Sequence, residues 1–134
     1  MVKLIIGLKG SGKTTRLIDQ VNDKVNSTDG AVVCVEKGTR LRGQINIDAR
    51  LINAEEFVGC GDDFFGFIAG IVASNHDVKD IFIDSAIKMF DKDVLRFAPF
   101  VLKLDKFASE HDVNFVITSS IAEENLPTEL EKFV

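Results

Sequence analysis

The chain has 134 residues, of which 46% are hydrophobic and 28% charged, a balance that excludes wholesale disorder. Its formal net charge of −5 gives no strong nucleic-acid signal, because a general nucleic-acid coat needs excess positive charge to displace counterions. No apolar run is long enough for a membrane span or a signal peptide, and the two cysteines match no metal-binding spacing, so we expect a cytoplasmic protein without a membrane partner.

Short apolar runs alternate with longer segments of helical periodicity along the chain. Four runs rich in β-branched residues predict strands at 2–6, 31–35, 81–83 and 113–117, and a shorter strand is expected at 50–53. Such continuous runs are typical of strands buried on both faces, as in a parallel sheet covered by helices. The alternation predicts a single α/β domain over 1–134, a three-layer sandwich with a mainly parallel sheet.

Two of the segments between strands carry signals for the start of a helix. The run Asn53-Ala54-Glu55-Glu56 has the form of a capping box, which predicts one helix that starts there and continues past Phe64. Asp91 or Asp93 is expected to begin the last long helix. Pro99 lies inside that helical pattern and predicts either a kink or the start of a second half.

Directly after the first predicted strand comes Gly7-Leu8-Lys9-Gly10-Ser11-Gly12-Lys13-Thr14, the Gly-x-x-x-x-Gly-Lys-Thr pattern of a phosphate-binding loop, or Walker A motif. Glycines let the backbone turn tightly around one phosphate, and the following helix points its N-terminus at the same anion. The Lys13 ammonium can reach the β- and γ-phosphates, and the Thr14 hydroxyl can bind Mg²⁺. The residues expected to bind the nucleotide are Gly7, Gly10, Ser11, Gly12, Lys13, Thr14 and Thr15.

A second element, Asp80-Ile81-Phe82-Ile83-Asp84, is an apolar strand with an acid at each end. Ligands of open α/β sheets bind at the carboxyl ends of the strands, which favours Asp84 over Asp80 as a functional residue. Together with the phosphate loop, this element resembles the Walker B motif of a P-loop nucleoside triphosphatase. The resemblance implies that Asp84 helps to hold Mg²⁺ through its water shell.

The residue after Asp84 is Ser85, where many ATPases have a glutamate that orients the attacking water. The chain here resembles the RecA-like branch, in which the glutamate comes from the end of the strand after the phosphate-loop helix, the place of Glu36. The resemblance also implies that Ser119 or Ser120 senses the γ-phosphate, and that the strand before them lies between the phosphate-loop strand and the acidic strand. A solvated acid at Glu36, and serines that only cap a turn, are the competing interpretations.

The resemblance implies an ATP-binding, Mg²⁺-dependent ATPase of RecA-like type, with Lys13, Glu36 and Asp84 as its catalytic residues. One alternative is a small nucleoside or nucleotide kinase similar to thymidine kinase, although those enzymes usually have Asp-Glu after the Walker B strand and a cysteine-rich zinc module. Another is a nucleotide-binding regulatory protein with negligible turnover. The sequence offers no feature that selects the nucleobase or an acceptor substrate.

The segment after the second predicted strand is basic and includes Arg40 and Arg42. Its arginines could contact phosphates, supply an arginine finger to a neighbouring subunit of a homo-oligomer or larger assembly, meet a polyanion, or face solvent. The sequence leaves these alternatives open.

Overall fold

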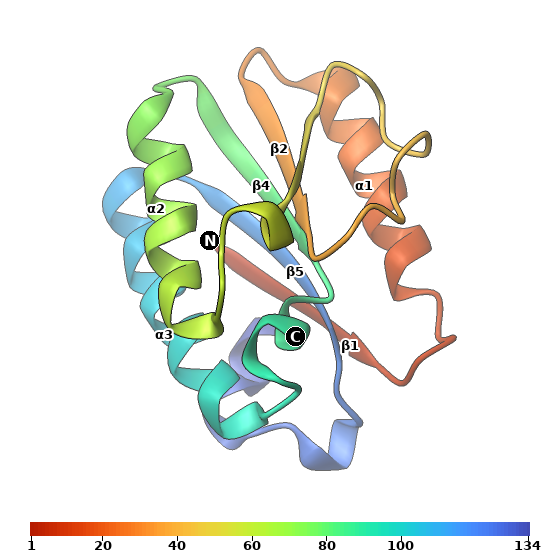
Figure 1. The fold of residues 1–134 in the computed structure, drawn as a ribbon, viewed down its shortest axis with the longest axis vertical. Coiled ribbons are helices and arrows are strands. Elements are labelled where there is room, and N and C mark those ends of the chain that lie inside the picture. The colour runs from red at the N-terminus through yellow and green to blue at the C-terminus, as the bar shows by residue number, and fades with distance from the viewer.

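Five parallel strands form one sheet in the computed structural model, which describes residues 1–134 (Figure 1). The strands are β1 (Val2–Gly7), β2 (Ala31–Glu36), β3 (Arg50–Asn53), β4 (Val78–Asp84) and β5 (Asn114–Ser120). Their order across the sheet is β1-β5-β4-β2-β3. All five predicted strands are confirmed, and so is the insertion of β5 between β1 and the acidic strand β4.

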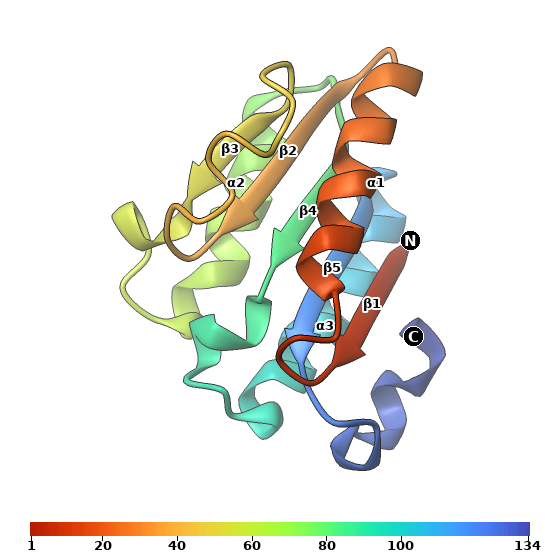
Figure 2. The same cartoon turned by 90° about the vertical axis from the view of Figure 1, so that its right-hand side faces the viewer.

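Three α-helices cover the two faces of the sheet: α1 (Lys13–Ser27), α2 (Phe64–Ser74) and α3 (Val94–His111). Helix α1 lies against one face, and α2 and α3 lie against the other (Figures 1 and 2). On β2, Val32 and Cys34 pack in the cluster on the α1 side, while Val33 and Val35 pack in the larger cluster on the α2 and α3 side. Burial on both faces explains the continuous apolar strands and confirms the three-layer α/β sandwich.

The helix predicted from the capping box is wrong in its first part. Asn53 caps only a short 3₁₀ turn, η1 (Ala54–Glu56), and the α-helix begins later, at Phe64. The intervening chain is rich in glycine, which disfavours a helix. Gly61 in this stretch also allows a close approach, because a Cβ atom there would lie 2.6 Å from the carbonyl oxygen of Met89.

Helix α3 begins at Val94, with Asp93 as its N-cap: the Asp93 carboxylate accepts a hydrogen bond from the Leu95 N–H group at 2.9 Å. This confirms one of the two predicted starts. The helix is continuous from Val94 to His111 and includes Pro99, which lies on its exposed side. No helix of the chain combines the length and the hydropathy that crossing a bilayer requires.

Because every neighbouring pair of strands is parallel, all five carboxyl ends lie at one edge of the sheet. The register places Gly7 beside Ser120 and Glu36 beside Asp84. Residues far apart in sequence are therefore gathered at the edge where ligands of open α/β sheets bind.

Candidate functional site

The phosphate loop connects β1 to α1 in a conformation that needs its glycines. Gly7, Gly10 and Gly12 have φ angles of 148°, 87° and 87°, in the region that L side chains rarely adopt. A Cβ atom on Gly7 would also lie 2.5 Å from the Ser11 hydroxyl oxygen. The N-cap of α1 is Gly12, and no side chain caps the N–H groups of the first turn. These groups and the helix dipole are therefore available to an anion.

The side chain of Lys13 is folded back onto this loop. Only 7% of Lys13 is exposed, and its ammonium group donates hydrogen bonds to the Leu8 carbonyl oxygen at 2.9 Å and to the Ser11 hydroxyl at 3.4 Å. Burial lowers the pKa of Lys13 below its ordinary value, and the negative charge of Asp84 opposes that shift. A phosphate group bound in the loop would give this ammonium a stronger, charged acceptor.

Asp84 at the end of β4 is 2% exposed and joins the phosphate loop to β5. The Thr14 hydroxyl lies 3.2 Å and 3.4 Å from the two Asp84 carboxylate oxygens, and donates toward them. The Thr118 hydroxyl donates to Asp84 Oδ1 at 2.7 Å, and the Ser85 hydroxyl donates to Oδ2 at 3.4 Å. The structure therefore brings Thr14 and Asp84, the two residues expected to hold Mg²⁺, within hydrogen-bond distance at the sheet edge.

The chemistry of these donors fits Mg²⁺. No group of three or more His, Cys, Asp or Glu side chains is placed to hold a metal. Mg²⁺ instead keeps several waters and binds through one or two protein oxygens together with phosphate oxygens. The Thr14 hydroxyl and the Asp84 carboxylate supply such oxygens beside the loop that would hold the phosphates.

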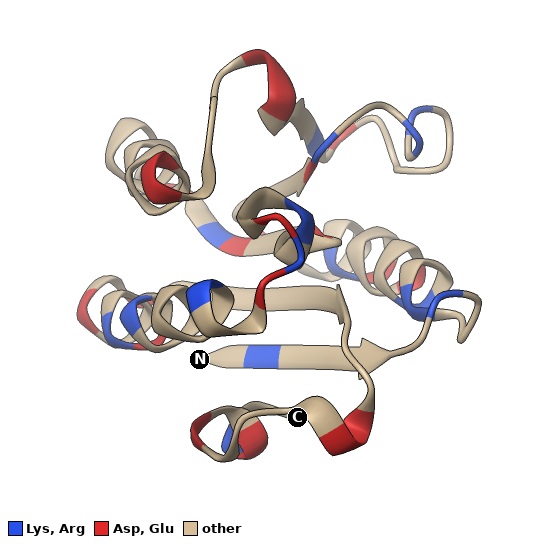
Figure 3. Ribbon diagram, turned by 60° about the horizontal axis from the view of Figure 1, so that its bottom comes forward, with Lys and Arg blue, Asp and Glu red and all other residues tan.

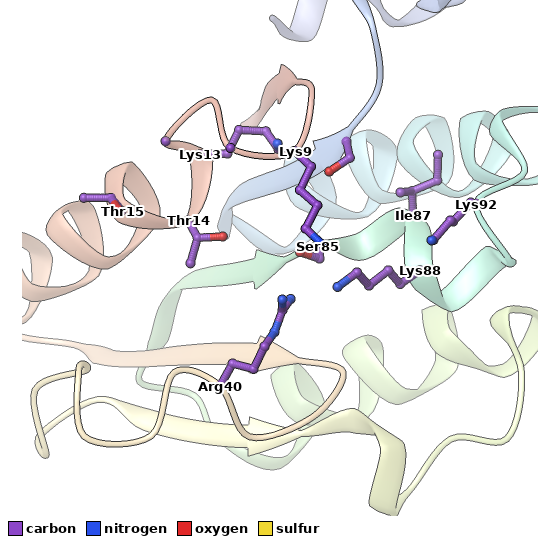
Figure 4. Close-up of a pocket in the computed structure, with 12 residues that line it drawn as sticks. Lys9, Lys13, Thr14, Thr15, Arg40, Ser85, Ile87, Lys88 and Lys92 are labelled. Atoms are coloured by element: carbon purple, nitrogen blue, oxygen red, sulfur yellow. The ribbon is translucent and has the colours of Figure 1, made fainter.

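A cavity of about 520 Å³ opens beside the phosphate loop. Twelve residues line it: Lys9, Gly10, Gly12, Lys13, Thr14, Thr15, Arg40, Ser85, Ile87, Lys88, Lys92 and Ser120 (Figure 4). Five of them are basic and none is acidic, although the net charge of the chain is −5. In Figure 3, basic segments of the phosphate loop and of the chain after β4 lie around the same edge of the sheet. The cavity is suited to a ligand with several negative charges.

Glu36 lies at this edge but does not line the cavity. It is 3% exposed, and its two carboxylate oxygens accept hydrogen bonds from the N–H groups of Arg40 at 3.1 Å and Leu41 at 2.9 Å. In this structure Glu36 anchors the loop after β2. It is not a solvated acid, and it does not contact the cavity. Its role toward an attacking water stays a prediction.

The two serines predicted to sense the γ-phosphate lie in different surroundings. Ser120 is exposed and lines the cavity. Ser119 is fully buried, and its hydroxyl accepts a hydrogen bond from the Ile87 N–H group at 3.3 Å. Of the two, only Ser120 faces the space where phosphates would lie.

The structure adds residues to the site that the sequence did not single out. Lys88 and Lys92 line the cavity from the segment after β4, and the Thr118 hydroxyl donates a hydrogen bond to Asp84. The signal available in the sequence was the pair of lysines four residues apart, shortly after β4. Arg40 and Arg42 are both exposed, but only Arg40 lines the cavity.

Comparison with known proteins adds one finding about the fold. No protein family and no curated protein matches this sequence. Among solved structures, the chain is similar to a KaiC-like protein from the hyperthermophilic archaeon Pyrococcus horikoshii, with 20% sequence identity and a TM-score of 0.64. The similarity covers 98% of this chain and 66% of that protein, so the chain spans about two thirds of its length. At this identity the similarity shows a shared fold, in agreement with the RecA-like strand order.

Proposed function

We propose that this protein binds ATP together with Mg²⁺ in the cavity beside the phosphate loop and hydrolyses it, as a RecA-like ATPase does. The observation that carries the proposal is the hydrogen bond of Thr14, which lines a cavity with five basic side chains, to Asp84, 70 positions away in the sequence. A phosphate loop, an acidic strand end and concentrated positive charge together match the requirements of a Mg²⁺-bound triphosphate.

Each part of the site would have a separate task. The loop N–H groups and Lys13 would bind the phosphates, and Thr14 and Asp84 would hold the Mg²⁺, Thr14 as a ligand and Asp84 by way of the cation's waters. The cation neutralises charge that develops on the phosphoryl oxygens during transfer. Ser120 contacts the terminal phosphate from the end of β5, which lies next to the phosphate-loop strand.

We further propose that Glu36 orients the attacking water. This requires its carboxylate to exchange one of its hydrogen bonds to the Arg40 and Leu41 N–H groups for one to the water. Glu36 lies beside Asp84 in the register of β2 and β4, and so at the same edge of the sheet as the cavity. A residue that anchors the loop and also orients the water would couple loop position to turnover.

The experiment measures phosphate release from ATP with and without Mg²⁺. The parent should release phosphate only when Mg²⁺ is present, and Asp84→Asn should abolish release, because the neutral amide cannot offset the charge of the cation. Asp80→Asn is the matched control, since Asp80 lies at the opposite end of the same strand. Glu36→Gln should lower kcat by roughly 10²–10⁴-fold. A variant in which KM rises at unchanged kcat would limit Glu36 to the loop anchor.

Absence of phosphate release from the parent, with ATP still bound, would contradict the hydrolysis part of the proposal. Adding a panel of nucleosides to the same assay separates the remaining alternatives. A phosphorylated nucleoside would identify a kinase, and tight binding without any product would identify a nucleotide-dependent regulatory protein.

A further inference from the structure

The cavity has two basic walls that come from different parts of the chain. Lys9 and Lys13 belong to the phosphate loop. The second wall consists of Arg40, from the loop after β2, and of Lys88 and Lys92, from the segment after β4, which line the same cavity (Figure 4). The phosphate loop accounts for the first wall, but nothing in the phosphate-loop pattern requires the second.

Arg40 is held in place by the structure of its loop. The Glu36 carboxylate accepts hydrogen bonds from the N–H groups of Arg40 and Leu41, and Leu41 is 1% exposed in the cluster under α1. The Arg40 carbonyl oxygen accepts a hydrogen bond from the Gln44 side chain at 2.9 Å. The Asn22 side chain on α1 donates to the Gln44 carbonyl oxygen and accepts from a further loop N–H group. The backbone that carries Arg40 is thus fixed from several directions.

Lys88 lies on η3 (Ala86–Phe90), a 3₁₀ turn that is fixed to the end of β5. The Ser85 N–H group donates to the Thr118 hydroxyl at 2.8 Å, and the Ile87 N–H group donates to the Ser119 hydroxyl at 3.3 Å. Buried Ile87 and Met89 flank Lys88 on both sides. The turn therefore presents Lys88 to the cavity on a rigid support.

The side chains of this second wall form no ion pair within the protein, although Glu55 and Asp91 line a neighbouring cavity together with Lys88 and Lys92. Arg40, Lys88 and Lys92 have no carboxylate within salt-bridge distance, and the nearby Asp91 pairs instead with Arg96 at 2.9 Å. Burial lowers the pKa of Lys88 most, and the positive charges of Arg40 and Lys92 lower it further, against the opposing effect of Asp84. Uncompensated like charges that face one cavity favour a bound anion.

We propose that Arg40 and Lys88, with Lys92 beside them, bind the terminal phosphate of the nucleotide from the same chain that supplies the phosphate loop. This inference rests on the proposed function and extends it. The second wall makes the site selective for a triphosphate over a diphosphate, because only the triphosphate extends from the loop to the opposite side. No arginine from a neighbouring subunit is then needed for this contact.

The test compares the Kd of ADP with that of the β,γ-imido analogue of ATP, both with Mg²⁺, by calorimetry. In Arg40→Ala and in Lys88→Met, the affinity for the imido analogue should fall by about tenfold or more, since charge-assisted hydrogen bonds are lost. The affinity for ADP should change less than twofold. Arg42→Ala and Lys106→Ala are the matched controls, because both residues are exposed and lie outside the cavity.

An equal loss of affinity for both ligands, or no change in either affinity, would overturn the inference and leave the proposed function intact. A parent protein that binds neither ligand would overturn the proposed function and the inference with it. Melting curves of each variant establish that it is folded. A loss of affinity only in the Arg42→Ala control would mean that Arg42, and not Arg40, contacts the terminal phosphate, and it would also overturn the inference.

Discussion

Lys88 is half-buried and has three other basic side chains near it, those of Arg40, Lys92 and Lys9. Burial and these charges lower its pKa below the ordinary value of 10.5, while Asp84 raises it. The charged form is therefore less favourable in the folded protein than in the unfolded chain. Below the folded pKa the whole of this penalty applies, and it disappears as the pH rises past 10.5.

Lys88→Met should therefore raise the melting temperature of the nucleotide-free protein at pH 7, because it removes the charge and keeps the length of the side chain. The gain should shrink as the pH approaches 10.5, the ordinary pKa of lysine. Lys106→Met is the control, since Lys106 is exposed and lies outside the cavity. An unchanged or lowered melting temperature in Lys88→Met at pH 7 would show that the positive cluster costs the fold nothing.

Residue by residue, the sequence predicted the centre of the site better than its surroundings. The approach of Thr14 to Asp84 could be predicted because a phosphate loop and an acidic strand end share one edge in a parallel sheet. The hydrogen bonds of Glu36 could not be predicted, because its partners are N–H groups of its own loop. The conformation of such a loop has no periodic signal in the sequence.

At the scale of elements, the end of β5 supports the segment that follows β4. The Thr118 hydroxyl donates to Asp84 and accepts from the Ser85 N–H group, and Ser119 accepts from the Ile87 N–H group. Ser85 has a φ of 55°, a left-handed conformation that is uncommon for serine. The two hydroxyls of β5 therefore hold an unfavourable turn at the edge of the cavity.

Thr118→Val should lower the free energy of unfolding by about 1–3 kcal/mol, because it leaves the Ser85 N–H group without a partner and removes one donor from Asp84. Urea denaturation at pH 7 measures this change. Thr118→Ser keeps the hydroxyl and should recover most of the lost stability. Equal midpoints and slopes for Thr118→Val and the parent would mean that the hydroxyl does not support this turn.

The elements themselves differ in how far sequence could predict them. The strands were predictable because burial on both faces produces unbroken apolar runs. The non-helical segment between Asn53 and α2 could not be predicted, because a single 3₁₀ turn satisfies the capping-box pattern at Asn53. This segment depends on Gly61 approaching the Met89 carbonyl oxygen, a contact between segments that no local pattern reports.

For the molecule as a whole, the net charge and the charge around the cavity have opposite signs. The chain has a net charge of −5, yet the cavity has five basic side chains and no acidic one. The fold produces this separation by bringing the phosphate loop, the loop after β2 and the turn after β4 to one edge of the sheet. Composition alone therefore gave no indication that the chain binds a polyanion. That indication came from the phosphate-loop motif.

The central claim is that the phosphate loop binds the phosphates of ATP, and calorimetric titration with the β,γ-imido analogue and Mg²⁺ tests it most directly. The parent should bind the analogue, and Lys13→Ala should weaken binding by about 10- to 100-fold, the loss expected for charged hydrogen bonds to phosphate. Lys106→Ala should bind like the parent, and melting curves should show that both variants fold. A parent that does not bind the analogue, or a folded Lys13→Ala variant that binds it equally well, would contradict the claim.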